Sequence, residues 1–276
     1  MDNKKRLTMT KTEKYLNDCF DFNSIRIDIE AKIDLSLPTQ ASYLKFFIDY
    51  VEFNYVFAGC VSSLAGRFHT SPSVEKCPVL DKVSHFVAKN VFEAAIDEYQ
   101  GITHKEMSLC MIRDMKEFFD DGYDLKPSKN LSVVLRNVRE GYGQTNECRF
   151  DELALNLGFH IASEKLASFE FSYLDTKIKE DYPEFYTYLN GNKAGQKFKS
   201  WLWVEIHGEV EEEHANFAFT ASDLIFNELE DEEKVDFLKK VQYGFNTFVE
   251  VQSEFFDAVS LQKEFEKGDL SILKLD

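Results

Sequence analysis

Residues 43–67 read YLKFFIDYVEFNYVFAGCVSSLAGR, and their hydrophobic pattern is helical. Apolar side chains recur at spacings of three and four residues, namely Leu44, Phe47, Ile48, Val51, Tyr55 and Ala58. This period gathers them on one face of an α-helix, so we predict a long helix over 43–65. A stretch near the end of the chain has the same period and predicts a C-terminal helix over about 231–262.

Short polar breaks separate further helical segments along the chain. Three of the five prolines, Pro72, Pro78 and Pro127, lie in these breaks, as a helical fold requires. The nearest candidate for a strand, NLSVVLRNV from Asn130, suits a short helix equally well. No break has the composition of a flexible interdomain linker. The sequence therefore predicts about eight or nine helices in a single all-α domain over residues 1–276.

The composition argues against several classes of partner. The chain has 32 Lys+Arg and 49 Asp+Glu, a formal net charge of −17, which repels nucleic-acid phosphates and anionic lipid headgroups. The longest uncharged stretch around the apolar middle, 54–66, is shorter than the roughly 20 residues that a membrane-spanning helix needs. The five cysteines form no CxxC pair, which gives little support to disulfides or thiolate zinc sites. We expect a soluble cytoplasmic protein without nucleic-acid or membrane partners.

The segment WLWVEIHGEVEEEHANFAF, residues 201–219, carries the most specific chemical pattern. On a helix, positions 0, +4 and +7 lie within about 40° of one line. His207, Glu211 and His214 therefore project from one face as imidazole, carboxylate and imidazole. This mixture of nitrogen and oxygen ligands suits iron or manganese. A solvent-facing charged stripe with two incidental histidines is the alternative that this segment leaves open.

A second segment, DEYQGITH at 97–104, also brings carboxylates and an imidazole together. Asp97 and Glu98 lie near the end of one helical segment, and His104 begins the next after a break at Gly101. These side chains converge if the break folds the chain back on itself. The alternative is an acidic helix terminus beside an unrelated capping histidine.

The third segment is GFHIASEKLA at 158–167, in which Glu164 has small and apolar neighbours. Burying a carboxylate there is costly unless it is paired or metal-bound. A simple hydrogen bond to His160, four residues earlier, is the alternative. The three segments together supply carboxylates and imidazoles from three helical regions, the kind of set with which helix bundles bind two irons.

These segments resemble the heme-oxygenase-like diiron oxidases and oxygenases, also described as iron-containing redox enzymes. The pattern H-x3-E-x2-H at 207–214, followed by Ala215, is similar to the family's H-x3-D-x2-H followed by Ala. DEYQG is similar to the element that carries a ligand Glu, with Asp97 as an alternative register, and GFHIASEKLA resembles the mid-chain helix with one ligand. The resemblance implies as metal ligands Glu98, His104, Glu164, His207, Glu211 and His214.

The resemblance spans about residues 43–220, the expected metal-binding core. It implies a heme-oxygenase-like bundle of about seven core helices, frequently a homodimer, that binds two non-heme Fe(II) ions per chain. Manganese suits the same ligands. The implied partners are O2 and a small-molecule substrate, an amino-acid derivative or an aliphatic acid. The implied reactions are N-oxygenation, carbon–carbon cleavage or decarboxylation, with no catalytic residue beyond the metal ligands.

Two other functions stay open. A metal-free helical interaction or effector protein suits the acidic composition equally well and would take up no stoichiometric iron. A thiaminase-like hydrolase on the same fold would need a nucleophilic cysteine in the pocket, and no family motif surrounds Cys60 or Cys110. The aromatic side chains between Phe46 and Phe57 either line an apolar pocket or pack in the core.

Overall fold

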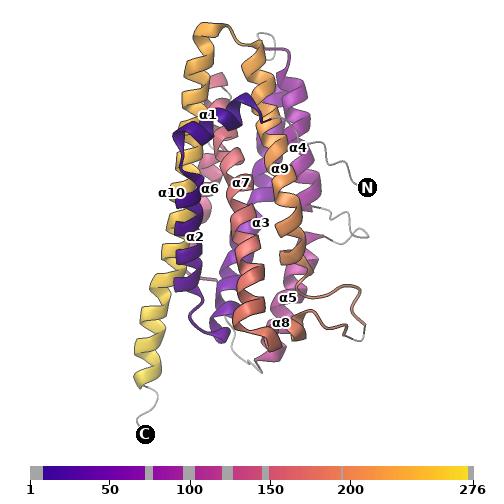
Figure 1. The fold of residues 1–276 in the computed structure, drawn as a ribbon, viewed down its shortest axis with the longest axis vertical. Helices are drawn as coiled ribbons and strands as arrows, with labels where there is room; N and C mark the ends of the chain where they lie inside the picture. The colour runs from indigo at the N-terminus through magenta and orange to yellow at the C-terminus, as the bar shows by residue number, and fades with distance from the viewer. Residues whose placement is uncertain are drawn as a thin grey trace.

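The computed structural model describes residues 9–71, 77–95, 103–119, 127–144, 149–193 and 195–272, and these form helices without strands (Figure 1). The helices are α1 (Lys11–Cys19), α2 (Phe22–Ser36), α3 (Gln40–Thr70), α4 (Leu80–Ala95), α5 (His104–Phe118), α6 (Leu131–Gly141), α7 (Phe150–Asp181), α8 (Pro183–Leu189), α9 (Leu202–Glu228) and α10 (Asp231–Ile272). The all-α prediction is confirmed, and the ambiguous stretch after Asn130 is helix α6. Helix α10 continues ten residues beyond its predicted end.

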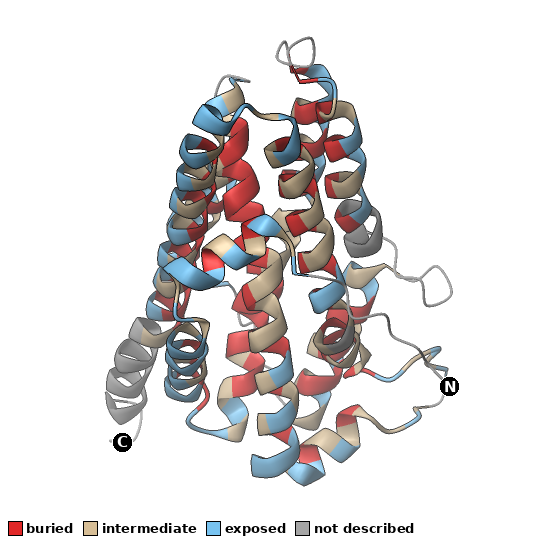
Figure 2. Ribbon diagram, turned by 45° about the horizontal axis from the view of Figure 1, so that its top comes forward, coloured by how far each residue is buried: buried red, intermediate tan, exposed pale blue. Residues whose placement is uncertain are grey.

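The long helices form a bundle in which α7 packs against both α9 and α10 (Figure 1). Helix α3 pairs most extensively with α4, and α4 in turn contacts α9. Buried residues follow the inward sides of these helices, and exposed residues follow the outer sides (Figure 2). No helix in the described ranges is long and apolar enough to cross a membrane.

Helices α7 and α10 approach closely because glycines lie at their contact. A Cβ atom at Gly158 would lie 2.0 Å from the carbonyl oxygen of Val241, and one at Gly244 would lie 1.9 Å from that of Leu155. Real Cβ contacts are never this short, so any larger residue would push the helices apart. These two glycines set the distance between α7 and the helix that covers it.

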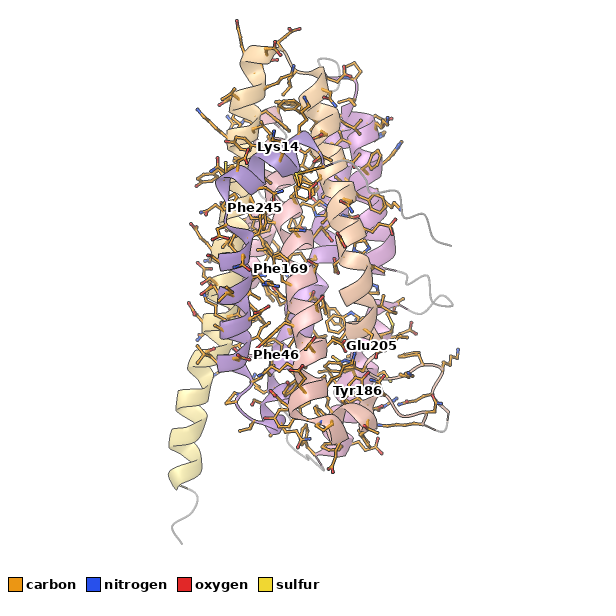
Figure 3. All side chains as sticks on the ribbon, in the orientation of Figure 1. Lys14, Phe46, Phe169, Tyr186, Glu205 and Phe245 are labelled. Atoms are coloured by element: carbon orange, nitrogen blue, oxygen red, sulfur yellow. The ribbon has the colours of Figure 1, made fainter. Side chains whose placement is uncertain are left out.

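Helix α3 is buried on more than the one face that its periodicity predicts. Phe46, Tyr50 and Phe53 are buried beside the predicted face, and the ring of Phe255 on α10 stacks on Phe53 with centroids 4.4 Å apart. The side chains of Phe46 and Phe245 lie within the bundle in Figure 3. Helix α3 therefore runs through the interior, and its aromatic side chains supply much of the core.

Local capping fixes where α5 begins. Thr103 accepts a hydrogen bond from the backbone N–H of Glu106, and the Glu106 carboxylate accepts one from the backbone N–H of Thr103. This reciprocal pair satisfies two donors that a helix start leaves open. His104 is thereby the first residue of α5, and the break before it ends at a defined point.

Candidate metal centre

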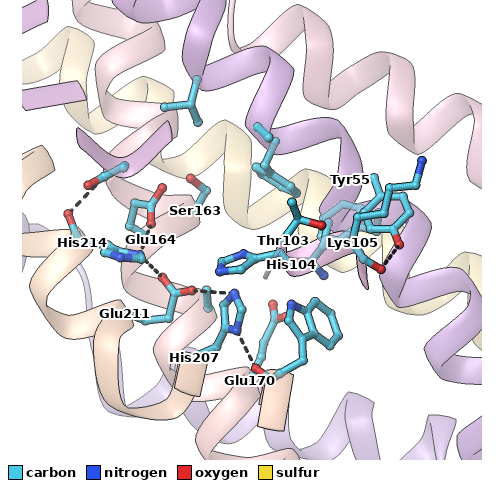
Figure 4. Close-up of a pocket in the computed structure, with 18 of the residues that line it drawn as sticks. Tyr55, Thr103, His104, Lys105, Ser163, Glu164, Glu170, His207, Glu211 and His214 are labelled. Atoms are coloured by element: carbon cyan, nitrogen blue, oxygen red, sulfur yellow. Dashed lines mark hydrogen bonds and ion pairs between the residues drawn. The ribbon is translucent and has the colours of Figure 1, made fainter. Parts of the chain in front are cut away.

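A cavity of about 340 Å³ lies between α3, α5, α7 and α9, and it holds the predicted donors (Figure 4). His104, Glu164, His207, Glu211 and His214 all line it. Five of the six predicted ligands thus meet at one site, although they come from three helices separated along the chain. The sixth, Glu98, and its alternative Asp97 lie outside the described residues.

Helix α9 presents its three predicted donors inward, as the spacing predicts. His207, Glu211 and His214 are each buried, with 5–6% of their surface exposed. The Nδ1 atom of His214 lies 3.2 Å from Oε2 of Glu211, and Nε2 of His207 lies 3.9 Å from Oε1 of the same carboxylate. Glu211 therefore lies between the two imidazoles. The alternative of a solvent-facing stripe is wrong.

Helices α7 and α5 add donors from the facing side. Oε2 of Glu164 lies 3.6 Å from Nδ1 of His214, so this imidazole faces two carboxylates. One donor atom from each of Glu164, Glu211 and His214 lies within 4.8 Å of the others. The ring of His104 meets that of His207 edge to face, with centroids 4.5 Å apart. Imidazoles and carboxylates thus surround a common space.

The separations of these donor atoms fit a metal ion. Two ligand atoms that each bind one ion at about 2.1 Å lie at most roughly 4 Å apart. The contacts of His214 and His207 with carboxylates, 3.2, 3.6 and 3.9 Å, all fall within that span. Buried carboxylates and imidazoles form the mixed oxygen and nitrogen set that suits iron or manganese.

The electrostatics of the site favour a cation there. Burial opposes a charge on His214, but hydrogen bonds and attraction from Glu164 and Glu211 outweigh it and raise the pKa of His214 to about 11. Burial raises the pKa of Glu211 to about 7, whereas contacts with His214 outweigh burial and lower the pKa of Glu164. The imidazolium of His214 thus supplies positive charge between two carboxylates. A metal ion bound between them would supply positive charge at the same place.

The other two imidazoles of the site are neutral. Burial lowers the pKa of His207 well below its ordinary value, and nearby His104 lowers it further. Burial, together with the charge of His214, lowers the pKa of His104 to about 4. Neutral imidazole is the form that binds metals, because a ring nitrogen must offer its lone pair.

A backbone contact orients His207. Its Nδ1 lies 2.5 Å from the carbonyl oxygen of Trp203, one turn earlier on α9. Since a carbonyl only accepts, Nδ1 carries the proton and Nε2 is left as the acceptor facing Glu211. Neither Nε2 nor an ionised Glu211 carboxylate can donate to the other. A metal ion between them would satisfy both.

A buried hydrogen-bond network lies behind Glu164. The sequence analysis predicted only one part of it, the His160–Glu164 pair. The Nδ2 group of Asn90 on α4 donates to Nε2 of His160 at 3.1 Å and to the backbone oxygen of His214 at 3.3 Å. The proton of His160 is therefore on Nδ1, which lies 3.3 Å from Oε1 of Glu164 and 3.2 Å from the Tyr142 hydroxyl. This arrangement agrees with both interpretations of Glu164, as a hydrogen-bond partner of His160 and as a metal ligand.

Glu170 is a further buried carboxyl group that the sequence analysis missed. It lines the cavity, accepts a hydrogen bond from the Tyr50 hydroxyl and another from the amide of Gln252, and is 4% exposed. Burial outweighs these bonds and raises its pKa to about 7. Because Glu170 lies six residues after Glu164, helical spacing places it away from the ligand face, and no sequence signal marked it.

The residues that line the cavity show which aromatic side chains of α3 face it and which pack in the core. Phe53, Tyr55 and Phe57 line the cavity with Trp203 and Phe248, whereas Phe46, Phe47 and Tyr50 pack in the core. Both expectations for this stretch therefore hold in part. Cys60 and Cys110 are not among the lining residues, so neither is placed as the nucleophile that a hydrolase would need.

Comparison with known proteins supports the fold. No family model matches the chain, and no curated protein matches it. Two solved structures of a CADD-like protein of unknown function from Nostoc punctiforme are similar, with TM-scores of 0.54 and 0.50 at 14% and 16% identity. Each match covers 88% of this chain and 95% or 98% of the other. The chain shares their helical fold. At this identity the likeness establishes the fold alone.

Proposed function

We propose that this protein is a non-heme diiron oxidase or oxygenase, which uses O2 to oxidise a small molecule. The ligands would be Glu98 or Asp97 together with the five donors that line the cavity, His104, Glu164, His207, Glu211 and His214. The observation that carries the proposal is the position of Glu211. Its carboxylate lies between His214 at 3.2 Å and His207 at 3.9 Å, inside a cavity large enough for a ligand.

The bound irons would supply the activation of O2, which no side chain can perform. The chain's own residues would hold and shield the reacting groups. Trp203 orients the ring of His207 through its backbone carbonyl, and the apolar side chains of Phe53, Phe57 and Phe248, which line the cavity, would limit the access of water. Glu170, whose pKa lies near neutrality, can hold or release a proton at the cavity wall.

Metal content tests the proposal directly. The purified chain is loaded with Fe(II) without oxygen, freed of excess metal, and assayed for iron per chain and for optical absorbance on mixing with O2. About two irons per chain and a transient visible band are the expected result. A chain that takes up no iron and does not respond to O2 would favour the metal-free interaction protein instead. Candidate amino acids and aliphatic acids should be present in one arm, since substrate can promote metal binding.

Paired substitutions determine which acidic residue before the break is a ligand. Glu98→Ala and Asp97→Ala differ by one position, and each removes one carboxylate. The variant that loses iron identifies the ligand. Equal iron in both variants and the unchanged chain would remove this segment from the ligand set.

A further inference from the structure

Glu170 lies between the cavity and a second hollow of the protein. It lines the cavity of the metal donors, as Figure 4 shows, and accepts a hydrogen bond from the side-chain amide of Gln252 on α10. Gln252 in turn lines a groove of about 250 Å³ between α2 and α10. One hydrogen-bonded pair of side chains, Glu170 and Gln252, therefore joins the groove to the cavity.

Polar side chains lead along the groove from the protein surface to Gln252. The Nζ atom of Lys32 on α2 donates a hydrogen bond to the hydroxyl of Ser253, the residue after Gln252, and lies 3.6 Å from a carboxylate oxygen of Asp28. Asp28 is exposed, and all of these residues line the groove. A polar groove of this size can hold water molecules that these side chains bind. Water in the groove therefore offers protons a path from solvent to the amide of Gln252.

Gln252 can bond to Glu170 in either protonation state. It is 2% exposed, its Nε2 donates to Oε1 of Glu170, and its amide oxygen has no hydrogen-bond partner within the described ranges. An amide donates through its nitrogen and accepts through its oxygen. After the amide turns over, its oxygen can accept a hydrogen bond from the protonated carboxyl. The pair thus stays hydrogen-bonded whether Glu170 is charged or neutral.

Tyr50 on α3, the other hydrogen-bond partner of Glu170, does not lead to solvent. Its hydroxyl donates to Glu170, the residue is 1% exposed, and burial holds the pKa of Tyr50 well above its ordinary value, so it keeps its proton. His104 of α5 and His207 and Glu211 of α9 line the same cavity, and no described cation forms an ion pair with Glu170. Burial therefore raises the pKa of Glu170 to about 7, at which a carboxyl group both releases and takes up protons in neutral solution.

We propose that Glu170 carries protons between the groove and the cavity, and that Gln252 admits water to it. Glu170 in its acid form gives its proton to an acceptor in the cavity and becomes a carboxylate. The amide of Gln252 then turns toward the groove, water reaches the carboxylate, and a proton from solvent restores the acid form. Only the use of the proton rests on the proposed function, because reduction of O2 takes up protons. The route itself needs no metal.

Infrared spectroscopy of the EDTA-treated full chain follows the proton on Glu170 directly. A protonated carboxyl group has a C=O band apart from the amide bands, and Glu170→Gln identifies the band by removing it. A rapid pH jump from below to above about 7 makes Glu170 lose its proton, and the reverse jump restores it. The change of the band with time gives the rate in each direction. Far-ultraviolet circular dichroism shows that each variant is folded.

Filling the groove should slow both rates. Ser253→Phe places a ring in the groove and leaves both hydrogen-bond partners of Glu170 unchanged. We expect both rates to fall roughly tenfold or more with the titration midpoint unchanged, since water then passes only when packed side chains open. Asp28→Phe fills the groove from α2 at an exposed position and should have the same effect. The matched control is Thr247→Phe, which adds the same ring on α10 in a different groove.

Unchanged rates in both Ser253→Phe and Asp28→Phe would overturn the proposal, because protons would then reach Glu170 from the cavity itself. Equal slowing in Thr247→Phe, or no infrared band that depends on Glu170, would also overturn it. These outcomes are separable from those of the iron assay. A chain that takes up two irons while its groove variants keep the original rates retains the diiron function and loses this inference. A chain without iron whose rates depend on the groove retains the inference and loses the diiron function.

Discussion

His207 donates its Nδ1–H to the backbone oxygen of Trp203 at 2.5 Å, and this one bond sets the direction in which the imidazole offers its lone pair. The acceptor belongs to the same helix one turn earlier, and the ring also stacks on that of Phe171 from α7, with centroids 4.5 Å apart. Nε2 then faces Glu211 at 3.9 Å. A backbone contact within α9 thus fixes which nitrogen of His207 faces the cavity.

Loss of either α9 imidazole should reduce metal binding without unfolding the chain. His207→Ala and His214→Ala each remove one nitrogen donor from a site lined by several others. We expect less than half of the iron of the unchanged chain, measured after anaerobic loading, with an unaltered circular dichroism spectrum. His85→Ala is the matched control, because His85 is exposed on α4 and does not line the cavity. Two irons in both cavity variants would contradict the ligand assignment.

Shortening Glu211 by one methylene should preserve the site. Glu211→Asp keeps the carboxylate between His207 and His214 and introduces the residue that the resembling family uses there. We expect iron content close to that of the unchanged chain, whereas Glu211→Gln should lower it because a neutral amide replaces the charged ligand. Iron content in Glu211→Gln equal to that of the unchanged chain would show that this carboxylate is not a ligand.

Asn90 should act on the metal site through the groups that it positions. Asn90→Ala leaves the backbone oxygen of His214 and the Nε2 atom of His160 without their buried donor. We expect the free energy of unfolding to fall by about 1–3 kcal/mol. Metal affinity should fall roughly ten- to a hundredfold, as for other residues that support metal ligands. Urea titration and competition with a chelator measure the two effects.

The control for that variant is Asn137→Ala. Asn137 donates to Glu254 in a part of the bundle away from the cavity. Its loss should leave metal affinity unchanged. If both substitutions weaken metal binding equally, Asn90 has no specific role in positioning the site.

Glu170 should make stability depend on pH. Its pKa rises from the ordinary value of 4.5 to about 7 on folding, because burial disfavours the charged form. Below about pH 4.5 the carboxyl is protonated in both folded and unfolded chains, so the full stability is present. As the pH rises to about 7 the unfolded chain loses its proton first, and stability falls by about 3 kcal/mol in total.

Glu170→Gln removes this titration and keeps an oxygen that can accept the hydrogen bond of Tyr50. Urea unfolding of the EDTA-treated chains between pH 4.5 and 8 measures the difference. We expect the variant to gain stability relative to the unchanged chain as the pH rises. A constant difference across this range would show that Glu170 has the same pKa in the folded and unfolded chains.

The close contact of α7 and α10 should tolerate no side chain at its glycines. Gly244→Ala would place a Cβ atom 1.9 Å from the Leu155 carbonyl oxygen, and the helices must separate to relieve this clash. We expect a loss of about 1–3 kcal/mol in the free energy of unfolding. Gly59→Ala is the control, because Gly59 lies in α3 with no atom within 4 Å of the new Cβ. That variant should gain about 0.5–1 kcal/mol, since alanine favours helix. Equal effects of the two changes would mean that the helices are not held at this distance.

The positions of the helices along the chain and the inward face of α9 follow from the sequence, because both depend on the spacing of nearby residues. The period of apolar residues predicts α3 and α10, and the +4 and +7 spacing from His207 places Glu211 and His214 on one face. Periodicity is less informative about the extent of burial. Val235 has the spacing of the apolar residues that predict α10, yet it is 58% exposed, because α10 begins only four residues earlier.

Only the tertiary structure shows which side chains from different helices meet. Spacing along one helix cannot reveal that Asn90 bonds to His160, 70 residues away, or that Tyr50 bonds to Glu170 across 120 residues. It also cannot show that Glu170 of α7 and His104 of α5 line one cavity. The sequence by itself determined the helices and the inward face of α9, because these rest on contacts within a few residues, and its resemblance to a known family implied the candidate ligands. Their assembly around one cavity, and the buried network behind it, depend on how the helices pack, which no local pattern encodes.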